Sequence, residues 1–183
     1  GLRYLLPAFP FVLVWVGQVA QSFLVPKLSL GNGGYPAGSL AGRLKCVVFA
    51  VLVTWQVVSV VRVAPHYLAY FNAFAGGPED GHRWLGDSNL DWGQDLKGLA
   101  KYVEAQDLKP VCVRYFGTMP PELYGLKACG EGPLEEGTIQ AVSVSLLQGL
   151  YLDDPNRFEH LRAEEPIATI GYTIRLYRTQ GAK

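Results

Sequence analysis

The polar segment DSNLDWGQD holds more side chains that could do chemistry than any other part of the chain. Asp87, Asn89 and Asp91 occupy the first three ligand positions of a calcium-binding loop. Trp92 then stands where the sharply turning glycine belongs, and Gly98 stands where the bidentate glutamate belongs. Hard cations need that missing carboxylate, so we expect no metal site in this segment.

Two other interpretations of the same segment remain open. Asp91 and Gln94 have the spacing of a capping box, in which each side chain bonds the other's backbone N–H at a helix start. Alternatively the segment is a binding surface, with Trp92 as a stacking ring for a sugar or a lipid headgroup. The candidate binding residues of this segment are Asp87, Asn89, Asp91, Trp92, Gln94 and Asp95.

The sequence lacks several common catalytic and metal-binding motifs. The histidines His66, His82 and His160 lie far apart and form no HxxxH pair, and neither GxSxG nor GxxxxGK[ST] occurs. Asp, His and Ser are all present, but nothing in their spacing places them as a triad. We therefore assign no catalytic residue and expect neither a metal nor another cofactor.

Charge divides the 183-residue chain into two unlike parts. Residues 1–63 contain no Asp or Glu and five basic residues. Residues 64–183 carry all 16 acidic residues against 11 basic ones, a formal charge of −5. An acidic domain without a basic run is a poor nucleic-acid binder, so we expect no nucleic-acid partner. The expected domains are 1–63 and 64–183.

Two apolar segments, at about 4–25 and 45–63, predict transmembrane helices. The second is short, and it spans a bilayer core of about 30 Å only if Lys45 and Arg62 snorkel. The alternative is a pair of buried helices in a soluble protein, although core helices rarely exclude acidic residues so completely. The loop at 26–44 holds basic residues and should lie in the cytoplasm. The acidic domain should then be extracytoplasmic.

The acidic part predicts a small α/β (or α+β) domain that follows the membrane α-helical hairpin. The aromatic run PHYLAYFNAF (65–74) has helical spacing and suits either an interfacial helix at the lipid headgroups or core packing. We expect helices near 91–106 and 120–124 and a short helix from Pro155. We expect strands near 110–118, 138–147 and 167–178, and Gly171 should bend the last of them.

The cysteines leave one alternative open. Cys112 and Cys129 both belong to the acidic domain, where they form either a disulfide or two buried thiols. Three cysteines in all, including Cys46, make neither a disulfide scaffold nor a zinc site of the usual spacing.

Several strings of the sequence resemble one enzyme family. RYLLPAFPF (3–11), PHYLAYFNAFAGGPEDG (65–81) and DSNLDWGQDLKGLAKYV (87–103) are similar to the C-terminal end of bacterial GT-C type membrane glycosyltransferases. These are the family 39 enzymes, which resemble protein O-mannosyltransferases and the lipid A aminoarabinose transferase. The likeness continues in YFGTMPPELYG (115–125), AVSVSLLQGLY (141–151) and IGYTIRLYR (170–178), so it covers nearly the whole chain.

This resemblance implies an integral protein of the bacterial inner or cell membrane, with membrane lipid as a partner. It would transfer a sugar from a polyprenyl-phosphate carrier to a glycan, lipid or protein acceptor on the extracytoplasmic side. The acidic catalytic residues of such enzymes lie in the first external loop, which matches nothing here. Because the chain also opens on Gly1 and a hydrophobic run, we expect a C-terminal fragment that is inactive by itself.

The resemblance also implies a role for Arg3 and Tyr4, which match the family's RYLLP segment at the outer end of a late helix. A guanidinium there would pair with the carrier phosphate. An ordinary interfacial anchor is an equally good interpretation.

A different class of function also fits the sequence, namely a non-enzymatic, membrane-anchored carbohydrate-binding or interaction module. The polar residues Gln18, Gln21 and Thr54 argue against it, because a lone hairpin would present them to lipid.

Overall fold

The computed structural model describes residues 9–24, 40–130 and 132–179. Arg3, Tyr4 and most of the loop expected in the cytoplasm lie outside these described residues. The chain divides into two compact units, Gly1–Val61 and Arg62–Lys183.

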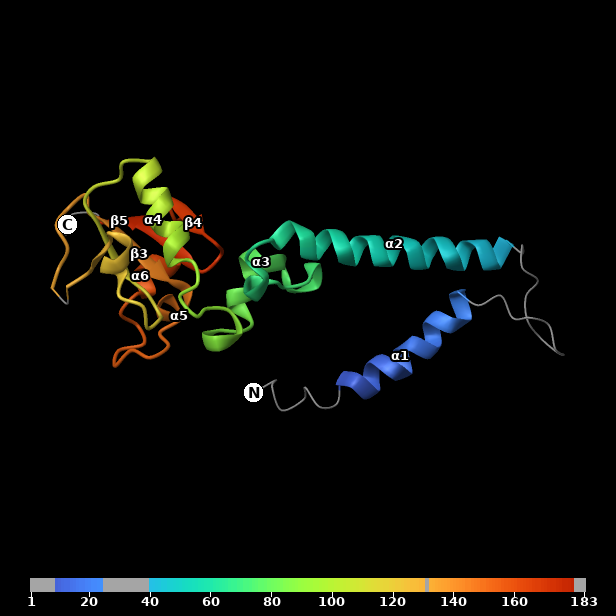
Figure 1. The fold of residues 1–183 in the computed structure, drawn as a ribbon. Coiled ribbons are helices and arrows are strands. Elements are labelled where there is room, and N and C mark those ends of the chain that lie inside the picture. The colour runs from blue at the N-terminus through green and yellow to red at the C-terminus, as the bar shows by residue number, and fades with distance from the viewer. Residues whose placement is uncertain (1–8, 25–39, 131, 180–183) are drawn as a thin grey trace. The chain divides into compact units, whose positions relative to one another are not determined.

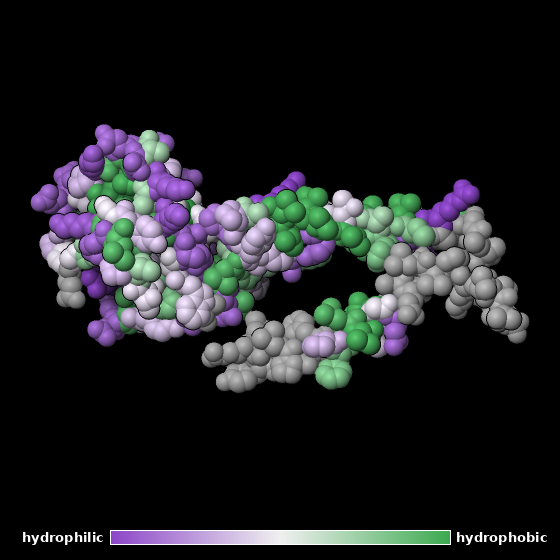
Figure 2. Space-filling view, viewed as in Figure 1, coloured by the Kyte–Doolittle hydropathy of each residue, from purple (hydrophilic) through white to green (hydrophobic). Residues whose placement is uncertain are grey.

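The described residues of the first unit are helical. Helix α1 spans Phe9–Leu24 and α2 spans Leu40–Val63. Within the described residues one helix, over Arg43–Val63, is long and apolar enough to cross a membrane by length and composition, with a mean hydropathy of 2.1. The 16 described residues of α1 extend about 24 Å at 1.5 Å per residue, less than a bilayer core. Figure 2 shows hydrophobic side chains along much of α2.

Short helical turns, and not the expected single helix, follow α2. The aromatic run at 65–74 is not one helix, because it contains the 3₁₀ helix Tyr67–Ala69 (η2) and leads into a second, Ala73–Ala75 (η3). Of the two interpretations the single helix is wrong, whereas Ala69 and Phe71 do pack in the apolar core. The Asn72 side chain accepts a hydrogen bond from the Ala75 N–H at 3.0 Å, which starts a new turn and interrupts the helical path. Three more short helical turns follow in the chain, namely α3 (Gly77–Asp80), η4 (Gly81–Arg83) and η5 (Asp87–Asn89).

A five-stranded mixed sheet forms the centre of the second unit (Figure 1). Its strands are β1 (Val111–Arg114), β2 (Lys127–Ala128), β3 (Ile139–Ser143), β4 (Ala168–Ile170) and β5 (Ile174–Arg178), in the spatial order β2-β1-β3-β5-β4. Strand β1 pairs in parallel with β2 and β3, whereas β5 pairs antiparallel with β3 and β4. The prediction of a small α/β domain is thereby confirmed.

The expected helices near 91–106 and 120–124 are present, as α4 (Leu96–Ala105) and the 3₁₀ helix η6 (Pro121–Tyr124). Helix α6 (Glu159–Arg162) begins four residues later than the expected start at Pro155. The reason is that the Asp154 carboxylate accepts from the Asn156 N–H at 2.9 Å, which makes an Asx turn instead of a helix cap.

All three expected strands are shorter in the structure than the sequence indicates. The strand predicted over 110–118 is β1, which covers only Val111–Arg114. The strand predicted over 138–147 stops at Ser143, where α5 (Val144–Leu147) begins. The segment 167–178 is a hairpin of β4 and β5 and not one bent strand. Its turn has positive φ at Gly171 (58°) and at Tyr172 (70°), as in the type I′ turns that suit the twist of a hairpin.

Helices cover both faces of the sheet (Figure 1). On one face Leu96 and Leu99 of α4 pack with Val113, Ile139, Ala141, Ile174 and Leu176 of the strands. On the other face Leu147 of α5 and Phe158 and Leu161 near α6 pack with Val142 and Tyr177. Two apolar clusters, one on each face, therefore hold the domain together by burial of nonpolar surface.

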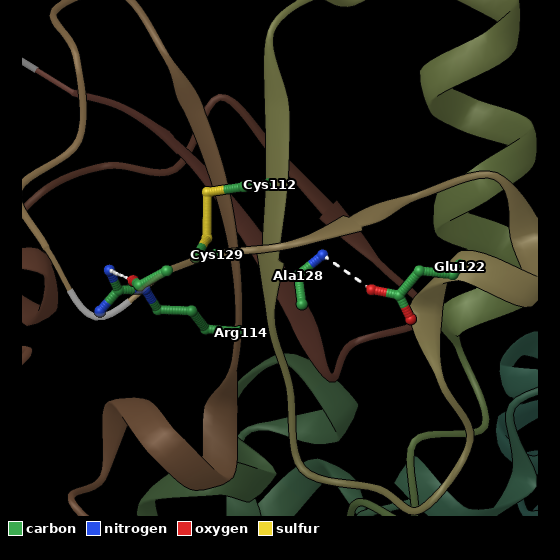
Figure 3. The surroundings of a disulfide bond; sticks show 6 residues. Cys112, Arg114, Glu122, Ala128 and Cys129 are labelled. Carbon is green, nitrogen blue, oxygen red and sulfur yellow. Dashed lines mark hydrogen bonds between the residues drawn. A yellow bond between two sulfur atoms is a disulfide. The ribbon is translucent and has the colours of Figure 1, made fainter.

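A disulfide joins the parallel edge of the sheet (Figure 3). It links Cys112 of β1 to Cys129, which directly follows β2, and the Cys129 N–H also donates to Val113 O at 3.0 Å. Arg114 Nη2 donates to Gly130 O at 3.0 Å beside it. Of the two alternatives that the sequence left open, the disulfide is the one present.

Candidate functional site

The structure divides the polar segment at 87–95 between surface and interior. Asn89, Trp92 and Gln94 are exposed, and the Trp92 side chain is 64% accessible. Asp91 and Asp95 are buried, with 0% and 3% of their surfaces accessible. The candidate binding residues therefore do not share one surface.

The capping box expected of Asp91 and Gln94 does not form. Helix α4 begins five residues after Asp91, at Leu96. Asp91 Oδ1 instead accepts from the Gly93 N–H at 2.9 Å, and Gln94 Oε1 accepts from the Trp92 N–H at 2.7 Å. These bonds hold a compact turn ahead of the helix.

Burial raises the pKa of Asp91 to about 6. The Gly93 N–H and the hydroxyls of Ser145 and Ser143 oppose that rise, and the nearby charge of Asp95 adds to it. Since its carboxyl group is enclosed by the turn and by the residues that end β3, Asp91 supports the fold and presents no group to a ligand.

Asp95 joins three segments that lie far apart in the sequence. Its Oδ1 lies 2.7 Å from Nδ1 of His66, and its Oδ2 accepts from the Thr173 hydroxyl at 2.6 Å. Asp95 is the N-cap residue of α4, yet its side chain makes no cap hydrogen bond. Aspartate at this position usually bonds the first helical N–H groups. Here the carboxylate is directed at His66 and Thr173 instead.

The pKa of Asp95 is raised, because burial outweighs the opposing effects of the Thr173 hydroxyl and of His66. Close packing by the β4–β5 turn keeps the carboxyl group in place. A side chain at Gly171 would put its Cβ 2.0 Å from Asp95 Cγ, so only glycine fits there.

The His66 ring lies between this carboxylate and a pocket of about 360 Å³. The side chain of His66 is 31% accessible, and its ring meets that of Tyr172 edge to face with 5.9 Å between centroids. His66, Glu79, Thr169, Gly171, Tyr172 and Arg175 line the pocket.

Arg175 approaches the ring of His82, with Nη2 at 3.2 Å from both ring nitrogens. The His82 Nδ1 is also 2.9 Å from Glu79 O. Burial and the positive charge of Arg175 lower the pKa of His82, so its ring is neutral at neutral pH.

The arrangement has two chemical capacities. The buried Asp95 carboxylate lies 2.7 Å from Nδ1 of His66 and orients the ring, which leaves Nε2 as the ring nitrogen for another partner. Arg175 adds a fixed positive charge in the same pocket. The pocket therefore suits an anionic or hydroxyl-bearing ligand.

Of the residues in this site, sequence reasoning selected Asp95 and missed its partners. His66, Thr173 and Arg175 lie 29, 78 and 80 positions from Asp95, and no local pattern relates them. Over the described ranges, no group of three or more His, Cys, Asp or Glu side chains could hold a metal ion. No family model, curated protein or solved structure matches this chain.

Proposed function

We propose that this chain is the C-terminal part of an integral-membrane glycosyltransferase that moves a sugar from a polyprenyl-phosphate carrier to an extracytoplasmic acceptor. The acidic catalytic residues would belong to a preceding region. In this proposal α1 and α2 form a membrane hairpin, and residues 64–183 form a domain that binds the carrier or the acceptor.

One observation carries the proposal. The apolar helix Arg43–Val63 ends three residues before His66, which lines the polar pocket. The backbone N–H of His66 also donates a hydrogen bond to the backbone oxygen of Val63 at 2.7 Å. If α2 spans the bilayer, the covalent chain keeps His66 within roughly 10 Å of the membrane end of the helix. A pocket so close to the headgroup layer is accessible to a lipid-borne substrate.

The disulfide supports the expected side of the membrane. Disulfides persist in oxidising compartments and are rare in the cytosol. The Cys112–Cys129 bond lies in the domain that follows α2, which favours an extracytoplasmic position for that domain.

Protease protection tests the topology. In spheroplasts that contain the full chain, protease added outside should digest residues 64–183 and leave the apolar segments in a carbonate-resistant membrane fraction. A domain that becomes accessible only after the membrane is opened would contradict the proposed orientation.

Sugar transfer is tested with the longer enzyme that this proposal implies, one that contains these 183 residues. Reconstituted in nanodiscs with a radiolabelled polyprenyl-phosphate sugar, it should label an acceptor, and removal of residues 64–183 should reduce that labelling. If the membrane-bound protein binds glycan or lipid but transfers no sugar, the non-enzymatic module becomes the better explanation.

A further inference from the structure

Arg175 carries a charge that the described ion pairs do not balance. Those pairs are Arg83–Asp80 and Lys109–Asp107, and the Asp95 carboxylate lies against His66. The Arg175 Nε atom is buried and lacks a hydrogen-bond partner among the residues that the structure describes. A guanidinium that is partly withdrawn from water is costly unless an anion accepts its hydrogen bonds.

The neighbours of Arg175 do not supply that anion. The His82 ring, at 3.2 Å, is neutral at neutral pH for the reasons given above. Glu79 lines the same pocket but forms no ion pair with Arg175 in the structure. Thr169 and Tyr172, which also line the pocket, carry hydroxyl groups and no carboxylate.

We propose that this pocket binds a phosphate group. Arg175 would be its main cation, and the hydroxyls of Thr169 and Tyr172 would donate further hydrogen bonds. A guanidinium has a planar fork of N–H donors that matches two phosphate oxygens at once. Glu79 would weaken the binding by repulsion and so favour phosphate groups of low negative charge.

The phosphate can belong to a membrane lipid or to a soluble molecule. The assignment to a lipid rests on the proposed function, because it requires α2 to hold His66 near the headgroups. The pocket chemistry itself does not depend on that placement.

The test uses the full chain in phosphatidylcholine nanodiscs. In the first arm inorganic phosphate is titrated, and binding is measured by ³¹P NMR and by hydrogen exchange of residues 168–178. In the second arm phosphatidic acid replaces part of the phosphatidylcholine. We expect the backbone amides of residues 168–178 to exchange more slowly in both arms. In the second arm, phosphatidic acid that already occupies the pocket should weaken the binding of added inorganic phosphate.

Three variants make the test specific. Arg175→Gln should weaken phosphate binding by roughly 10- to 100-fold, the range expected for a lost charge-assisted bond. Arg178→Gln removes an exposed arginine of the same strand outside the pocket and should leave binding unchanged. Glu79→Gln should tighten binding, a change of opposite sign that a misfolded pocket would not give.

Each result decides a separate question. Wild-type protein that binds phosphate in neither arm overturns the pocket assignment, even if the chain is firmly in the membrane. Equal losses in Arg175→Gln and Arg178→Gln would show nonspecific charge attraction and would also overturn it. Binding of inorganic phosphate by a chain that carbonate strips from membranes would retain the pocket and refute the proposed membrane function.

Discussion

The Thr173 hydroxyl donates a 2.6 Å hydrogen bond to Oδ2 of Asp95, although the two residues lie 78 positions apart. The same carboxylate is 2.7 Å from His66 Nδ1 through its other oxygen. Both oxygens of one buried side chain thus set the orientation of His66, since Thr173 prevents the carboxylate from turning.

Thr173→Val should lower the free energy of unfolding by about 1–3 kcal/mol, because it leaves a buried carboxylate oxygen without its donor. The loss should be larger at neutral than at acidic pH, since the deleted bond favours the charged form of Asp95. Chemical denaturation of the full chain in detergent at two pH values measures this. Thr173→Ser keeps the hydroxyl and is the matched control; an equal loss in both variants would point to packing instead.

Gly171→Ala should destabilise the domain and displace Asp95. The added Cβ would lie 2.0 Å from Asp95 Cγ, and φ is 58°. Gly125 also has positive φ (72°), but a Cβ there would meet nothing within 4 Å. Gly125→Ala therefore measures the backbone cost alone, about 1–2 kcal/mol. Thermal unfolding of both variants should show the larger loss for Gly171→Ala, and equal shifts would contradict the close approach.

Asp91→Asn should stabilise the protein above about pH 6. Asp91 has a pKa of about 6 in the folded chain against 3.8 as its ordinary value. The folded state therefore holds the proton more tightly, and stability falls as pH rises from about 4 to 6. The full effect is at most about 3 kcal/mol, at 1.36 kcal/mol per pKa unit. Asparagine keeps an acceptor for the Gly93 N–H and removes this decline.

Denaturation curves between pH 4 and pH 8 give the comparison. Asp153→Asn changes an exposed carboxylate and serves as the control. A wild-type protein whose stability does not fall between pH 4 and pH 6, or an Asp91→Asn variant that falls equally, would refute the assignment.

Loss of the disulfide should destabilise the domain by about 3 kcal/mol, the expected value for a loop of 17 residues. Cys112→Ser with Cys129→Ser removes the bond, and Cys46→Ser, in α2, is the control. Without reductant, maleimide-polyethylene glycol should modify neither Cys112 nor Cys129 in the denatured wild-type chain. Modification of both would show that the bond does not form in the cell.

Local sequence patterns revealed the elements but not the site. The apolar runs indicated α1 and α2, and the helical spacing of Leu96 and Leu99 indicated α4. The β4–β5 turn escaped detection because Tyr172 adopts positive φ, which is uncommon for a residue other than glycine.

The candidate site depends on contacts between distant segments, and periodicity describes only neighbours. The residues 87–95 form the most conspicuous polar cluster in the sequence, yet most of their bonds hold a turn. Of these residues, Asp95 contacts His66, which lines the pocket, and Thr173. In the sequence, His66 belongs to an aromatic run and Thr173 to an expected strand, so neither stands out as a site residue.

The order of strands in the sheet has a consequence for synthesis of the protein. Strand β5 is the last described strand to leave the ribosome, but it lies inside the sheet between β3 and β4. Until Ile174–Arg178 emerge, one edge of β3 has no backbone partner, although all five of its residues are buried in the finished domain. Such an open apolar edge is prone to pair with other chains. Nascent protein should therefore depend on a chaperone during this interval, and chains cut short before β5 should aggregate.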